Sequence, residues 1–181
     1  NAIPGFIPRA AQQQMAQAVA DTFEHNGLLV VEAGTGTGKT YAYLVPALMS
    51  GKRVVVSTGT KNLQDQLFHR DLPRVSDALR VPLRTALLKG RSNYLCLYRM
   101  KRPPGATGLR IDPARLRMVE EWSRSTTTGE LSELGIFESD DPITPRVTST
   151  TDNCLGAKCA DFNECFVAKA RRNAQAADLV V

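Results

Sequence analysis

A segment rich in glycine and threonine supplies the first residues whose types and spacing could do chemistry. It reads Ala33-Gly34-Thr35-Gly36-Thr37-Gly38-Lys39-Thr40 and matches the phosphate-binding P-loop pattern, except that Ala33 replaces its first glycine. Glycines let the backbone wrap a phosphate with its N–H groups turned inward, and a helix start adds partial positive charge. Lys39 would reach the β- and γ-phosphates of ATP, and the Thr40 hydroxyl would bind Mg²⁺. The segment predicts nucleotide binding without specifying the reaction.

The cysteines form a second set of residues with chemical potential. They are Cys96, Cys154, Cys159 and Cys165, separated by 57, four and five residues, so three cluster and one stands apart. A zinc ribbon usually has two close pairs, which this spacing does not give. Four such thiolates can instead hold a [4Fe–4S] cluster, which would join the ends of segment 97–150, a stretch with few apolar residues. Bound zinc and unligated cysteines are the alternatives.

Composition and charge set the broad class. The 181 residues are 43% hydrophobic and 23% charged, which is ordinary for a globular protein. No apolar run approaches the roughly 20 residues that span a bilayer, and the first residues do not resemble a secretory signal. We therefore expect a cytoplasmic protein without a membrane partner. The net charge is +5, with a basic stretch from Arg99 to Arg124 beside an acidic one from Glu130 to Asp141. This pattern suits a surface that follows a polyanion on one side.

The elements expected to position these residues alternate between strands and helices. Expected strands cover 28–31, 54–58, 85–88 and the last residues from 178, and expected helices cover 11–25, 39–49, 62–70, 113–123 and 166–176, with Pro73 interrupting the third. The alternation predicts an α/β fold with a parallel sheet. Because it breaks after Gly90, we assign 1–90 and 167–181 to an incomplete sheet domain and 91–166 to a mostly helical insertion.

In this order the motifs resemble a known family. After the P-loop come Ser57-Thr58-Gly59-Thr60 with Leu63-Gln64-Asp65-Gln66, then Gly90-Arg91-Ser92-Asn93-Tyr94-Leu95-Cys96 and the clustered cysteines. They resemble the XPD/DinG family of superfamily-two iron–sulfur DNA helicases, and Thr148 to Gly156 favours its bacterial YoaA-like branch. The resemblance covers nearly the whole chain. It implies a RecA-like motor domain with an inserted iron–sulfur domain, in an ATP-dependent helicase that moves 5′ to 3′ on single-stranded DNA in repair or replication.

The resemblance also implies roles for individual residues. Arg9 and Gln12 would approach the adenine, and the four cysteines would ligate the cluster. Arg91 and Tyr94 would hold a phosphate or stack on a base, with packing around the cluster as the alternative. Arg115 and Arg117 are DNA-facing candidates because they lie in the basic stretch. The expected DNA-contacting residues are Thr58, Thr60, Gln64, Arg91, Tyr94, Arg115 and Arg117.

Departures from the family pattern limit what this chain is expected to do. It contains no Asp-Glu-Ala-His box, and the nearest acidic doublets are Glu120-Glu121 and Asp140-Asp141. The second motor domain is also missing, so we expect no efficient ATP turnover or unwinding by this chain alone. The family suggests the chi subunit of the replicase clamp loader as a partner. The alternatives are a P-loop kinase with a zinc-bound cysteine lid and a cysteine-rich nucleic-acid-binding module.

Overall fold

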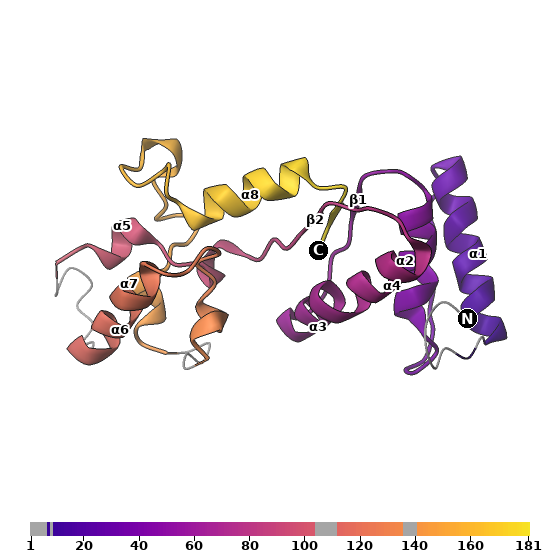
Figure 1. Ribbon diagram of the computed structural model, residues 1–181, viewed down its shortest axis with the longest axis horizontal. Coiled ribbons are helices and arrows are strands. Elements are labelled where there is room, and N and C mark those ends of the chain that lie inside the picture. Colours follow the sequence, from indigo (N-terminus) through magenta and orange to yellow (C-terminus); the bar gives the residue numbers. More distant parts are fainter. Residues whose placement is uncertain (1–6, 8, 104–111, 136–140) are drawn as a thin grey trace. The chain divides into compact units, whose positions relative to one another are not determined.

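The computed structural model describes residues 7, 9–103, 112–135 and 141–181 (Figure 1). The chain forms two compact units, and each is described by itself. Unit 1 contains residues 1–87 and 176–181, and unit 2 contains residues 88–175. Unit 1 is thus built from two separate stretches of chain. Unit 2 extends beyond residue 166, where the sequence suggested a boundary, because the helix that begins there contributes to its core.

The sheet of unit 1 is small and parallel. Its strands are β1 (Val54–Val55), β2 (Thr85–Ala86) and β3 (Leu179–Val180), in the order β1-β3-β2. The central strand β3 pairs in parallel with both neighbours. The N–H of Val54 donates to the carbonyl oxygen of Asp178 at 2.9 Å, and the N–H of Val181 donates to that of Ala86 at 3.0 Å. The predicted parallel α/β arrangement is confirmed at this level, including a strand in the last residues.

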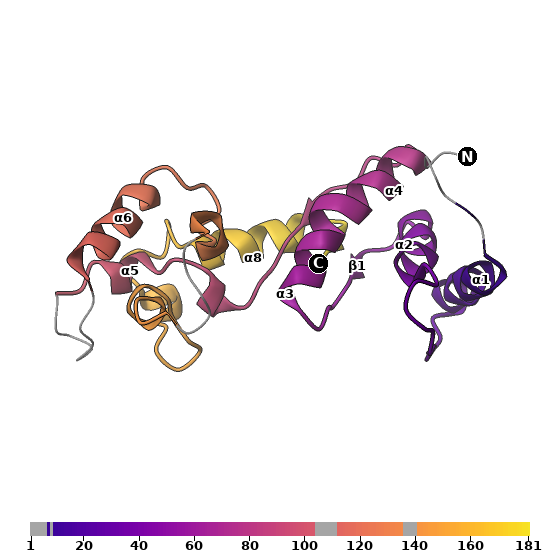
Figure 2. The same ribbon diagram turned by 90° about the horizontal axis from the view of Figure 1, so that it is seen from below.

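The described residues of unit 1 form the α-helices α1 (Ala10–His25), α2 (Lys39–Met49), α3 (Lys61–Gln66) and α4 (Leu72–Leu79). Helices α1 and α2 lie side by side in both views (Figures 1 and 2). A π-helical turn, Leu67–Asp71, joins α3 to α4, so the three form one continuous rod (Figure 2). The predicted interruption at Pro73 is wrong. Pro73 lies in the first turn of α4, where the absence of its N–H is tolerated.

The core of unit 1 lies between α2, the rod and β3. Leu44, Leu67, Leu72 and Val75 come from the helices, and Leu179 comes from the strand. These side chains are almost completely buried. Burial of this apolar area is the main force that holds the C-terminal strand against the earlier part of the chain.

The segment Leu28–Val31 departs from the prediction of a buried strand. It is not assigned as a strand and pairs with none of the strands among the described residues. Leu28 is 93% exposed and Val30 is 88% exposed, whereas Leu29 and Val31 are less so. This alternation is that of an extended chain with one open face. The prediction of a buried strand is therefore wrong: β1 and β2 are the edge strands of the described sheet, each pairs with β3, and this segment pairs with neither.

Unit 2 is mostly helical, as expected. Its helices are α5 (Leu97–Met100), α6 (Pro113–Ser123), α7 (Thr144–Val147) and α8 (Phe166–Ala176), with 3₁₀ turns at Arg91–Asn93, Leu131–Leu134 and Gly156–Lys158. Its core contains Tyr94, Leu95, Met100, Val119, Leu131, Ile143, Val147, Phe166 and Val167. The unit therefore has an apolar core of its own, although segment 97–150 has few apolar residues in sequence. In the part of the chain that the structure describes, no helix is long and apolar enough to cross a membrane.

Candidate functional site

The P-loop connects the extended segment Leu28–Val31 to helix α2. Gly36 and Gly38 have φ angles of +74° and +83°, a region that favours glycine. The Lys39 ammonium donates hydrogen bonds to the carbonyl oxygens of Ala33 at 2.7 Å and Gly34 at 2.6 Å. The Thr37 hydroxyl donates to the same Gly34 oxygen at 3.0 Å. Lys39 is thus held against the beginning of the loop, and a bound triphosphate would compete for these bonds.

Helix α1 reaches the P-loop through the two residues expected near the adenine. The Arg9 guanidinium donates to the carbonyl oxygen of Gly36, and Gln12 Nε2 donates to that of Gly38 at 3.0 Å. Gln12 is only 8% exposed. Its other amide atom, Oε1, is buried and has no hydrogen-bond partner among the described residues. A buried acceptor of this kind fits a ligand that brings its own N–H donor.

Thr40, the expected Mg²⁺-binding residue, has a neighbour that sequence reasoning missed. Tyr43 lies one turn further along α2 and shares a side-chain hydrogen bond with Thr40. Burial raises the pKa of Tyr43, the hydrogen bond from Thr40 lowers it, and the nearby charge of Asp71 raises it. The buried Asp71 carboxylate ends the π-helical turn and accepts from Gln66 Nε2 at 3.1 Å and Arg70 Nε at 2.9 Å. The three-residue spacing of Thr40 and Tyr43 was the sequence signal for this contact.

The structure brings together the three expected DNA-contacting residues of the second motif. Thr60 is the N-cap of α3, where its hydroxyl accepts from the N–H of Leu63 at 3.2 Å. The Thr58 hydroxyl donates to the Thr60 carbonyl oxygen at 3.3 Å, and the backbone N–H of Gln64 donates to the same oxygen at 3.0 Å. These bonds build the turn into α3. Contact of the three residues with DNA stays a prediction.

All four cysteines line one cavity in unit 2, with a volume of about 390 Å³. Cys96 directly precedes α5, Cys154 and Cys159 flank the 3₁₀ turn at Gly156–Lys158, and Cys165 directly precedes α8. Each is a free, half-buried thiol. Burial raises the pKa of the Cys96 thiol, and Cys159 and Cys165 act in the same direction from nearby. The backbone N–H of Gly156 lies 3.4 Å from the Cys154 sulfur, to which it donates.

The four thiols are the candidate ligands of a metal site in unit 2. Within the described residues, no group of three or more His, Cys, Asp or Glu side chains lies close enough to hold one metal ion. A [4Fe–4S] cluster offers a separate iron to each thiolate, so its ligands stand farther apart than those of a single zinc ion. The four thiols that line one cavity are the residues that could hold such a cluster, and zinc stays the alternative.

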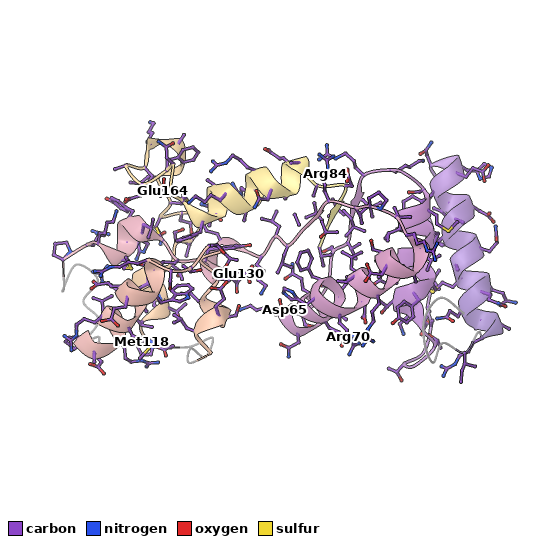
Figure 3. The ribbon with its side chains drawn as sticks, viewed as in Figure 1. Asp65, Arg70, Arg84, Met118, Glu130 and Glu164 are labelled. Atoms are coloured by element: carbon purple, nitrogen blue, oxygen red, sulfur yellow. The ribbon has the colours of Figure 1, made fainter. Side chains whose placement is uncertain are left out.

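Tyr94 corrects one expectation about DNA contact. Its side chain is 1% exposed and lies in the core of unit 2, where it cannot stack on a base. Its hydroxyl accepts from the backbone N–H of Lys89 at 3.0 Å. The Lys89 ammonium forms an ion pair at 2.7 Å with Glu130, which is labelled in Figure 3, and both side chains are largely buried. Packing, the alternative reading for Tyr94, is what the structure shows.

The expected basic surface is partly neutralised by internal contacts. Arg115 pairs with the buried carboxylate of Asp141, whereas Arg117 is exposed. Arg91 lines the cysteine cavity. At the start of the same basic stretch, the Arg99 guanidinium donates to the carbonyl oxygen of Pro145, and Lys101 pairs with Asp161. Arg110 lies outside the described residues. Arg117 is thus a stronger candidate for DNA contact than Arg115.

Comparison with known proteins defines the class. The chain matches the DEAD/DEAH box helicase family over residues 9–124 and belongs to that family. It is 53% identical over 183 residues to the ATP-dependent DNA helicase YoaA of Escherichia coli and 51% identical over 181 residues to YoaA of Haemophilus influenzae. It is 41% identical over 204 residues to the ATP-dependent helicase DinG of Mycobacterium tuberculosis. These similarities confirm the resemblance drawn from the motifs.

The matches cover the chain and only part of each relative. They include 98% to 100% of this chain but 28% to 30% of the three relatives, so the chain spans less than a third of their length. A further relative, named the 3′-5′ exonuclease DinG of Bacillus subtilis, is 31% identical over 184 residues, which is 99% of this chain and 20% of that protein. The names of these relatives therefore give two different reactions, that of a helicase and that of an exonuclease.

Proposed function

We propose that this chain is the amino-terminal part of an ATP-dependent DNA helicase that carries a [4Fe–4S] cluster. The observation that carries the proposal is the convergence of four free cysteines on one cavity, in a chain of the DEAD/DEAH box helicase family that also has a P-loop. Membership of that family sets aside the small-molecule kinase alternative.

The P-loop and α1 would bind ATP. Lys39 would exchange the carbonyl oxygens of Ala33 and Gly34 for phosphate oxygens, and Thr40 would offer its hydroxyl oxygen to Mg²⁺. The buried Oε1 of Gln12 would accept a hydrogen bond from the amino group of adenine. Guanine carries an oxygen at the corresponding ring position, so this contact would favour ATP over GTP.

The four cysteines would hold the cluster as deprotonated thiolates. When bound, the cluster supplies iron–sulfur bonds that cross-link the starts of α5 and α8 to the turn between Cys154 and Cys159. Unit 2 would then be the iron–sulfur domain inserted in the motor domain. Its apolar core and these bonds would stabilise the same fold.

The resemblance to the XPD/DinG family supports the remaining features. By this resemblance the whole protein moves 5′ to 3′ on single-stranded DNA, acts in repair or replication in the cytoplasm, and meets the chi subunit of the clamp loader. Since the Asp-Glu-Ala-His box is not in this sequence, the chain alone would not hydrolyse ATP efficiently. DNA-stimulated hydrolysis by this chain would contradict that expectation.

The deciding experiment is a metal analysis of the chain purified without oxygen or chelator. We expect about four iron and four sulfide per chain, with little zinc. Cys159→Ser should lose most of both, whereas Ser132→Ala, an exposed serine outside the cavity, should lose neither. Two results would contradict the proposal that the cysteines hold a cluster. One is zinc without sulfide after reconstitution with iron and sulfide, and the other is a folded chain without metal.

A second measurement tests the nucleotide site against the nucleic-acid-binding alternative. Lys39→Ala should abolish binding of a fluorescent ATP analogue, because the ammonium is the main counter-charge for the phosphates. In a cysteine-rich module whose P-loop does not bind nucleotide, wild type and Lys39→Ala would give the same result in this binding measurement. Lys52→Ala is a matched control, because Lys52 binds Phe23 and Asn26 away from the loop.

A further inference from the structure

One face of helix α8 lies on the cysteine cavity. Its lining residues along the helix are Val167, Ala168, Arg171, Arg172 and Gln175. Counted from Ala168, spacings of three, four and seven residues place the last four of these side chains on one face of the helix. Elsewhere on α8, Phe166 and Ala174 are buried. The apolar packing of the helix thus sets which side chains it presents to the cavity.

The charge on the cavity lining is positive. Arg91, Arg171 and Arg172 line it, and Asp161 is the carboxylate among the lining residues. Asp161 is already paired with Lys101. Among the residues that the structure describes, no carboxylate forms an ion pair with Arg171 or Arg172. Both therefore keep an uncompensated positive charge beside the four thiols.

The start of α8 adds to this charge. Cys165 directly precedes the helix, and its carbonyl oxygen accepts from the N–H of Lys169 at 2.9 Å. The first N–H groups of a helix have no acceptor within it and carry partial positive charge. Val167 and Ala168, in that first turn, also line the cavity. The helix therefore presents both a backbone dipole and two cations to the cavity.

We infer that Arg171 and Arg172 of α8 raise the reduction potential of the cluster bound by the four cysteines and help to retain it. The inference rests on the proposed cluster. A cluster held by four thiolates is anionic and becomes more negative on reduction, so nearby cations stabilise the reduced form more. The arginines act through charge and are positioning residues, not ligands.

The experiment compares Arg171→Gln, Arg172→Gln and the double variant with wild type, all as the anaerobic holoprotein. Iron, sulfide and circular dichroism are measured first, and the reduction potential is then measured by spectroelectrochemical titration. Lys169→Gln is the matched control: it removes the same charge from the same helix, but Lys169 pairs with Glu164 at 3.0 Å and does not line the cavity.

We expect the potential to fall in each arginine variant, with the equilibrium constant for reduction decreasing roughly three- to tenfold per arginine, since both side chains are exposed and partly screened. The double variant should fall further and lose iron faster under oxygen. The potential of Lys169→Gln should be unchanged.

Four results would overturn the inference. Normal iron and sulfide with an unchanged potential would refute it while the proposed cluster stands, and a fall in affinity for single-stranded DNA alone would assign the arginines to phosphate binding. A shift equal to that of Lys169→Gln would show a non-specific charge effect and would also refute it. Wild type without iron and sulfide would refute the proposed function, and the inference with it.

Discussion

Gln12 and Gly38, 26 residues apart, are in direct contact: Gln12 Nε2 donates to the Gly38 carbonyl oxygen at 3.0 Å. A Cβ added to Gly38 would lie 2.1 Å from the same nitrogen. The contact joins helix α1 to the last turn of the P-loop before Lys39. The shape of the phosphate-binding loop therefore depends on a side chain outside the P-loop motif.

Gly38→Ala should weaken the binding of Mg²⁺-ATP by about tenfold or more. The new methyl group would collide with the Gln12 amide, and the φ angle of +83° strains any residue with a Cβ. Titration with a fluorescent ATP analogue measures the effect. Gly59→Ala is the control, because its Cβ would meet nothing within 4 Å. Adding Gln12→Ala removes the collision but also removes the proposed contact with adenine and leaves the strain, so the double variant should not regain wild-type affinity. Full affinity in Gly38→Ala would contradict the role of this contact.

The pair Arg84–Asp178 should make the stability of unit 1 depend on pH. Asp178 accepts from the backbone N–H of Arg84 at 3.0 Å and from its guanidinium at 2.8 Å and 3.2 Å. The side-chain hydrogen bond from Arg84, followed by the backbone one, lowers the pKa of Asp178 from 3.8 to about 2. A carboxylate with a lowered pKa stabilises the fold above its unfolded pKa, and this contribution disappears as the pH falls through its folded pKa.

Asp178→Asn should therefore lower the urea midpoint of unfolding at pH 7 relative to wild type. The difference should shrink between pH 3.8 and about pH 2, where the wild-type carboxyl becomes protonated. Asp77→Asn, on the exposed side of α4, should show little difference at either pH. A constant difference for Asp178→Asn down to pH 2 would show that the pair contributes through shape alone.

Tyr94→Phe should destabilise unit 2 without changing the affinity of the chain for single-stranded DNA. The change leaves the N–H of Lys89 buried without its acceptor, which costs about 1–3 kcal/mol in the free energy of unfolding. Denaturant unfolding measures this cost, and Tyr98→Phe serves as the comparison in the same unit. Affinity for single-stranded DNA should not change, since the side chain is buried. Weaker DNA binding at unchanged stability would restore the base-stacking role.

Arg117→Gln and Arg115→Gln should have different effects. Arg117 is exposed, so its loss should weaken single-stranded DNA binding and reduce the salt slope by about 0.7. Arg115 pairs with the buried Asp141, so its loss should mainly destabilise unit 2. DNA titrations at several salt concentrations, with unfolding curves, separate the two effects. Equal DNA affinity and equal stability for both variants would exclude this assignment.

Helices with strong local signals could be predicted from the sequence. The bounds expected for α2, α6 and α8 agree with the structure. Glycines precede and follow α2, and Pro113 occupies the first turn of α6 behind the Asp112 cap. These signals act within one turn of the helix. The Pro73 prediction failed because the same residue can interrupt a helix or begin one, and the packing of Leu72 and Val75 in the core favours the second.

The sequence by itself determined which residues can do chemistry here: a loop that can wrap phosphates and four thiols with spacing suited to a cluster. Only the tertiary structure decided that these thiols share one cavity, that β3 lies between β1 and β2, and that Tyr94 is buried. The physical reason is the distance along the chain over which each interaction acts. Backbone preferences act over a few residues, whereas strand pairing and burial join segments such as Val54 and Leu179 that are far apart in the chain.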